Sequence, residues 1–108
     1  MFNMFNSKPS LSLKEIFEKT QSKENYFVDV RTPPEYAAVH AFGAESIPLN
    51  TIDSSVVEKL KGYKEVYVIC QSGGRSAAAT SLLVSNGVNA INVEGGTNAW
   101  RAEGLPVI

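Results

Sequence analysis

The sequence contains only one cysteine and one histidine among its 108 residues. A lone cysteine cannot form an internal disulfide, which excludes the disulfide frameworks that stabilise many small secreted domains. One cysteine and one histidine also cannot supply the ligands of a structural zinc site, and we expect neither a metal nor a cofactor. Long hydrophobic runs are absent too, because no apolar segment approaches the roughly 18 residues of a membrane-spanning helix.

Neither sign of charge is in excess, since 10 lysines and arginines stand against 11 aspartates and glutamates, for a net charge of −1. This balance lacks the basic surplus that is typical of proteins binding nucleic acids or anionic membranes, and we expect neither as a partner. The basic start and long apolar core of a secretory signal are missing from the first ten residues, MFNMFNSKPS. We therefore expect a flexible N-terminal end over residues 1–10 and a cytoplasmic location, where a free thiol stays reduced.

The composition is that of a soluble globular protein, with 44% hydrophobic and 19% charged residues, and the length fits one domain, placed at residues 11–108. The predicted strands cover residues 25–30, 65–70 and 89–93, with a short extended piece at 43–50. The predicted helices cover residues 11–20, 32–39, 53–62, 75–87 and 97–104. This alternation predicts an α/β fold with a mostly parallel central sheet of about five strands and helices on both faces.

The lone cysteine lies in the stretch VYVICQSGGRSAAA, residues 66–79. Cys70 ends an apolar predicted strand, and residues 71–75 connect that strand to the next helix. In open parallel sheets, ligands bind at this carboxyl edge. The alternative interpretation is an inert core thiol, because cysteine is among the most buried residue types.

Three features of this loop favour a reactive thiolate at Cys70. The loop leads into a helix, whose N-terminus carries a partial positive charge of about half an elementary charge. Gly73 and Gly74 can take backbone conformations that turn successive N–H groups toward an anion. Arg75 adds a permanent charge that can hold an oxyanion. Phosphatases with a cysteine nucleophile place one more residue between cysteine and arginine, so the shorter loop favours sulfur chemistry over phosphate chemistry.

Four segments of the sequence form a pattern, namely DVRTPPEYAAVHAFGAESIPL, VYVICQSGGRS, NVEGGTNAW and GLPV. In their order and spacing these segments resemble the rhodanese family of sulfurtransferases. The first is similar to the family's Asp-Val-Arg to Ile-Pro-Leu signature, and the second to its active-site strand and loop. The resemblance extends from about Leu11 to Val107 and implies a rhodanese-like domain.

The resemblance implies that Cys70 is the nucleophile and becomes a persulfide. The sulfur would come from a small anionic donor such as thiosulfate and pass to cyanide or a thiol. It further implies that the loop backbone stabilises the persulfide and that Arg75 helps to bind the donor. The predicted substrate-binding residues are Gln71, Ser72, Gly73, Gly74, Arg75 and Ser76.

The remaining polar residues near the signature are interpreted as structural. Asp29, Arg31 and Glu35 are expected to form an ion pair near the site, in which Arg31 and a carboxylate tie a strand end to the next helix. His40 is expected to be a hydrogen-bonded structural histidine, because persulfide chemistry requires no base. Val39 and Ala41 depart from the family pattern of a glycine and a larger aliphatic residue, so the segment around His40 is expected to run differently.

Three hypotheses about function stay open at this point. The first is a sulfurtransferase, the second a sulfur-carrier or redox-sensing module that serves a partner protein, and the third a non-catalytic or phosphatase-like relative. No second cysteine can resolve a persulfide within the chain. The acceptor would therefore be external, whether cyanide, a small thiol, a reductant or a partner protein's cysteine. Trp100 is expected to lie in the core.

Overall fold

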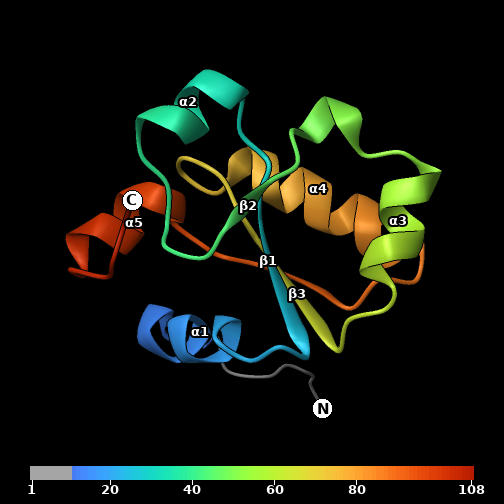
Figure 1. Cartoon of the computed structure of the whole chain (residues 1–108), viewed down its shortest axis with the longest axis horizontal. Coiled ribbons are helices and arrows are strands. Elements are labelled where there is room, and N and C mark those ends of the chain that lie inside the picture. The colour runs from blue at the N-terminus through green and yellow to red at the C-terminus, as the bar shows by residue number, and fades with distance from the viewer. Residues whose placement is uncertain (1–10) are drawn as a thin grey trace, which may run out of the picture.

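The computed structural model describes residues 11–108, so the flexible end predicted at residues 1–10 lies outside the described residues. The helices are α1 (Leu13–Thr20), α2 (Pro33–Ala38), α3 (Ser54–Leu60), α4 (Gly74–Ser85) and α5 (Gly96–Ala102). The strands are β1 (Asn25–Asp29), β2 (Glu45–Ser46), β3 (Glu65–Ile69) and β4 (Ala90–Asn92), with a short 3-10 helix at Leu49–Thr51. Strands and helices alternate as predicted (Figure 1). In this described part, no helix has both the length and the apolar character required to span a bilayer.

The strands form one parallel sheet in the order β2-β1-β3-β4. The α/β class and the parallel sheet are confirmed, but the prediction of about five strands is wrong for residues 11–108, which form a sheet of four. Within residues 11–108, the extended segments around Ala41 and Val107 pair only with each other, through one isolated antiparallel bridge. They therefore lie outside the sheet and do not extend it.

The two faces of the sheet are covered by different helices, because successive strand residues point to opposite sides. On one face, Val28 of β1 shares a buried apolar cluster with Leu60 of α3 and Leu83 of α4. On the other face, Phe27 packs in a cluster with residues of α1 and α5. Figure 1 shows these helix pairs on opposite sides of the sheet, which confirms the prediction of helices on both faces. Trp100 is fully buried in the second cluster, so its predicted place in the core is confirmed.

The carboxyl ends of β1 and β3 lie side by side, since Asp29 is opposite Ile69 in the parallel register. Just beyond, the N–H of Val30 donates to the carbonyl of Ile69 at 3.1 Å. The segments that follow these strands, residues 30–35 and 70–75, therefore meet at one edge of the sheet. In Figure 1 this is the end of the sheet that carries α2 and the loop before α4.

Candidate active site

Cys70 follows β3 directly and is almost fully buried, with 1% of its surface exposed. Its Sγ accepts a hydrogen bond from the backbone N–H of Gly73 at 3.1 Å and another from the hydroxyl of Ser76 at 3.2 Å. Gly73 is the N-cap of α4 and has a φ of +112°, a left-handed conformation that favours glycine. The sulfur therefore lies at the N-terminus of a 12-residue helix, with hydrogen-bond donors directed at it.

Burial raises the pKa of the Cys70 thiol, but the hydrogen bonds to the sulfur together outweigh that effect. The hydroxyl of Ser76 contributes most to the lowering, followed by the backbone amides of Ser76, Gly73 and Ser72. The pKa of the thiol consequently lies below its ordinary value. A lower pKa increases the share of thiolate at neutral pH, and the thiolate is the reactive form of cysteine.

Replacing Ser76 with alanine is expected to raise the pKa of the Cys70 thiol, because the thiolate loses the donor that stabilises it most. A hydrogen bond to a charged group contributes about 1.5 kcal/mol or more, so alkylation by iodoacetamide near pH 7 should slow by about tenfold. The alkylation rate as a function of pH, followed by mass spectrometry, measures the shift. Ser81→Ala, at an exposed position of the same helix, should keep the wild-type profile. A Ser76→Ala profile equal to that of wild type would show that the hydroxyl does not control the reactivity of the thiol.

The N-terminus of α5 fixes the cysteine loop from behind. The backbone N–H and the hydroxyl of Thr97 both donate to the carbonyl of Cys70, at 2.8 Å and 3.0 Å. The N–H of Asn98 donates to the carbonyl of Gln71 at 3.1 Å. These contacts hold the backbone that carries the sulfur.

The sequence alone does not mark Thr97 and Asn98 as part of the site, although the neighbouring glycine pair indicates the contact. Gly96 has a φ of +60°, and a Cβ added to it would lie 2.6 Å from the carbonyl oxygen of Cys70. Two consecutive glycines, Gly95 and Gly96, are typical of such a close approach of two backbone segments. The glycine pair therefore indicates the packing of α5 against the cysteine loop.

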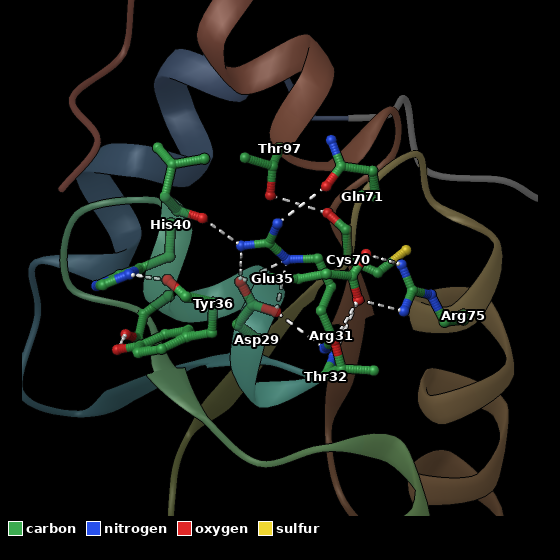
Figure 2. Close-up of polar contacts among 12 residues, drawn as sticks. Asp29, Arg31, Thr32, Glu35, Tyr36, His40, Cys70, Gln71, Arg75 and Thr97 are labelled. Carbon is green, nitrogen blue, oxygen red and sulfur yellow. Dashed lines mark hydrogen bonds and ion pairs between the residues drawn. The ribbon is translucent and has the colours of Figure 1, made fainter.

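A buried arginine supports the loop from the side of β1. Arg31 is 1% exposed and forms a salt bridge with Asp29, in which Nη2 and Oδ2 are 2.8 Å apart. Its Nη1 donates to the side-chain oxygen of Gln71 at 2.9 Å, and its Nη2 donates to the carbonyl of Val39 at 2.6 Å. The amide of Gln71 donates in turn to Asn98. Figure 2 shows the contacts of Arg31 with Asp29 and Gln71, and the side chain of Gln71 turned toward Arg31 instead of the Cys70 sulfur.

Glu35 does not join the pair of Asp29 and Arg31, which corrects the expectation of one ion-pair group. Its two carboxylate oxygens bind Arg75, with Nη1 to Oε1 at 2.7 Å and Nη2 to Oε2 at 3.0 Å. The physical reason is burial: the guanidinium of Arg31 is enclosed with Asp29, whereas Glu35 on α2 stays at the surface beside the start of α4. Figure 2 shows the two separate pairs.

The segment around His40 is held by Tyr36 and takes no part in the surroundings of the sulfur. The ring of His40 stacks on that of Tyr36 with centroids 3.7 Å apart, and its Nδ1 lies 2.8 Å from the Tyr36 carbonyl oxygen. Val39 has a φ of −167°, which is extended backbone that any residue adopts, so the departure from glycine introduces no strain. Ala41 is fully buried, and its small side chain fits where the chain pairs with Val107.

A hollow of about 300 Å³ lies beside Arg75 at this edge of the sheet. Its lining residues are Val30, Arg31, Thr32, Pro33, Pro48, Leu49, Asn50 and Arg75. Of the predicted substrate-binding residues, Arg75 lines this hollow, while Ser72 on the loop and Gly74 at the start of α4 are exposed. The arrangement can therefore present a thiolate, backbone N–H donors and one guanidinium at the same edge of the sheet.

Comparison with known proteins connects this arrangement to a family. The model of the rhodanese-like domain matches residues 11–103. A sulfurtransferase of Allochromatium vinosum is 33% identical over 106 residues, which cover 97% of this chain and 96% of that protein. Thiosulfate sulfurtransferase 16, chloroplastic, of Arabidopsis thaliana is 36% identical over 92 residues, which cover 74% of this chain and 77% of that protein. The chain spans only 55% of the length of uncharacterized protein slr1261 of Synechocystis sp., at 35% identity.

A solved structure agrees with these sequence matches. The rhodanese-related protein from Thermoplasma volcanium has a TM-score of 0.79 and 32% identity, over 94% of this chain and 98% of that chain. The family match spans the segment after β1, the cysteine loop and the glycine pair at the start of α5. The chain therefore belongs to the family of rhodanese-like domains.

Proposed function

We propose that this protein is a sulfurtransferase that moves a sulfane sulfur from a small anionic donor, such as thiosulfate, to a thiol or cyanide through a persulfide on Cys70. The observation that carries the proposal is the position of Sγ at the N-terminus of α4, where it accepts hydrogen bonds from Gly73 and Ser76. Such donors stabilise an anionic sulfur and are fixed before the reaction begins.

In the first step, the thiolate of Cys70 attacks the outer sulfur of thiosulfate. A new S–S bond forms to Cys70, the S–S bond of thiosulfate breaks, and sulfite leaves with the electron pair. The protein then carries one additional sulfur as a persulfide anion. The total charge is the same before and after the step, so no proton and no outside oxidant is required.

In the second step, the acceptor attacks the outer sulfur of the persulfide. Cyanide leaves as thiocyanate, or a thiolate leaves as a new persulfide, and Cys70 regains its thiolate in either case. Because Cys70 is the single cysteine of the sequence, the acceptor comes from outside the chain. The same observation favours a second candidate function, that of a carrier that delivers its sulfur to a partner protein.

The loop and Arg75 have separate proposed roles. The backbone from Gln71 to Gly74 would surround the anionic sulfur, with Ser76 as its hydroxyl donor, and Arg75 would bind the donor. This assignment is supported by the N–H of Gly73, which already points at Sγ, and by the place of Arg75 in the lining of the hollow. The side chain of Gln71 is a positioning group, since it is engaged with Arg31 and Asn98.

Intact-mass spectrometry tests the persulfide directly. Wild-type protein that is incubated with thiosulfate and then freed from it is expected to gain the mass of one sulfur. Cys70→Ser is expected to gain nothing, because a hydroxyl at this position is not ionised and cannot displace sulfite. A wild-type protein that stays unmodified with thiosulfate and with other sulfane-sulfur donors would exclude the proposed mechanism.

A comparison of acceptors separates the enzyme from the carrier. Persulfide-loaded protein is offered cyanide, a small thiol and candidate acceptor proteins, and the loss of the extra sulfur is timed. An enzyme that acts on small molecules transfers the sulfur fastest to cyanide or the small thiol. A carrier transfers fastest to one protein cysteine.

A further inference from the structure

Arg75 lines the hollow beside the cysteine loop and is at the same time paired with Glu35. We propose that Glu35 is a specificity-determining residue: by occupying Arg75, it favours singly charged sulfane-sulfur donors with an apolar group over the doubly charged thiosulfate. This inference rests on the proposed persulfide function and names the class of donor that the site would use.

In the ion pair with Glu35, Arg75 already uses the N–H groups that would bind an oxyanion of the donor. Nη1 and Nη2 of Arg75 donate to the two oxygens of Glu35 at 2.7 Å and 3.0 Å, the two-pronged geometry in which guanidinium groups bind oxyanions. Glu35 first, and the Cys70 thiolate more weakly, raise the pKa of Arg75, so this guanidinium lies within electrostatic reach of the sulfur. A donor that binds Arg75 in the same way must displace the carboxylate or approach close to its charge.

The carboxylate of Glu35 is a fixed charge. Its Oε1 accepts hydrogen bonds from the backbone N–H of Thr32 at 3.1 Å and from the hydroxyl of Thr32 at 2.9 Å, in the capping box of α2. Arg75 first, and then Thr32, lower the pKa of Glu35 to about 2. The group therefore stays ionised throughout the neutral range and opposes a dianion at any physiological pH.

The rest of the hollow offers a dianion no free cation among the residues that line it. Arg31, the other cation of the lining, is already bound to the carboxylate of Asp29. The apolar part of the lining consists of Val30, Pro33, Pro48 and Leu49. A donor with one charge is repelled less by Glu35 and by the thiolate, and an apolar group on that donor can be buried against this wall.

Thiosulfate and methanethiosulfonate form a matched pair of probes, because a methyl group in the second replaces one charged oxygen of the first. Thiosulfate thus has two negative charges and methanethiosulfonate has one. With methanethiosulfonate, the Cys70 thiolate attacks the terminal sulfur, the S–S bond of the donor breaks, and methanesulfinate leaves with the electron pair. Both donors leave the same persulfide on Cys70, so only the charge and shape of the leaving group differ.

Glu35→Gln is the test variant, since glutamine removes the charge and still suits the capping box of α2. The wild type is expected to have the higher kcat/KM with methanethiosulfonate. In the variant, kcat/KM for thiosulfate should rise by about tenfold, mainly through KM, and that for methanethiosulfonate by only about threefold, because Coulomb energy scales with the donor's charge.

Glu24→Gln is the matched control. Glu24 precedes β1 at the opposite, amino end of the strands and is 70% exposed in its pair with Lys64. Removing this charge should leave kcat/KM for both donors unchanged. A general effect of net charge would instead appear in Glu24→Gln as well as in Glu35→Gln. If both donors load Cys70 but Glu35→Gln changes kcat/KM equally for the two donors, or not at all, the specificity role is overturned and the persulfide function stands. If neither donor loads Cys70, both proposals fail.

Discussion

Replacing Arg31 with methionine is expected to lower the free energy of unfolding by about 3–5 kcal/mol. Methionine can fill the space of the aliphatic stem, but it leaves the fully buried carboxylate of Asp29 without its cation. The carbonyl of Val39 and the side chain of Gln71 also lose their donors. A loss of this size is a large share of the about 5–15 kcal/mol that stabilises a typical small domain.

Urea unfolding, followed by the fluorescence of the single tryptophan, Trp100, measures this change. Arg75→Met is the matched control for stability, because its pair with Glu35 is partly exposed and should contribute less than about 1 kcal/mol. Adding Asp29→Asn to Arg31→Met should recover part of the loss, since no unpaired buried charge then remains. An Arg31→Met variant as stable as Arg75→Met would contradict the assigned role of the buried pair.

The elements of the fold could be predicted because each carries its own local signal. Ser12 and Glu15 form the reciprocal capping box at the start of α1 that their spacing predicts. The number of strands could not be predicted, because a short extended segment has the same local pattern whether or not it finds a partner. Residues 45–46 pair with β1, whereas Ala41 forms one isolated bridge with Val107.

In the candidate site, too, local features could be predicted from the sequence and tertiary pairings could not. The sequence places Cys70 beside the start of α4 because strand, loop and helix are consecutive in the chain. It does not select the partner of Glu35, since Arg31 is close in sequence and Arg75 is 40 residues away. That choice depends on burial: Arg31 is enclosed with Asp29, and burial of one of two candidate arginines is a tertiary property.

Replacing Gly96 with alanine is expected to displace the cysteine loop and to slow the proposed formation of a persulfide by about a hundredfold, because small misplacements of a reacting group reduce rates strongly. The added Cβ would lie 2.6 Å from the carbonyl oxygen of Cys70 and 2.6 Å from the carbonyl carbon of Gln71. These are backbone atoms, which cannot rotate aside as the end of a flexible side chain can. Either the loop or α5 must therefore shift, and the hydrogen bonds from Thr97 that hold Cys70 are weakened.

Gly104→Ala separates this close approach from the general effect of a left-handed backbone. Gly104 has a φ of +76°, but among the described residues no atom lies within 4 Å of an added Cβ. Both variants should lose about 1–2 kcal/mol of stability for an alanine in this conformation, and Gly96→Ala should lose more because its Cβ also meets backbone atoms. Only Gly96→Ala should also gain mass more slowly with thiosulfate. Equal rates in the two variants would mean that Gly73 and Ser76 hold the sulfur without support from α5. A rate lost in Gly96→Ala alone would make the packing of α5 a condition for the reactivity of Cys70.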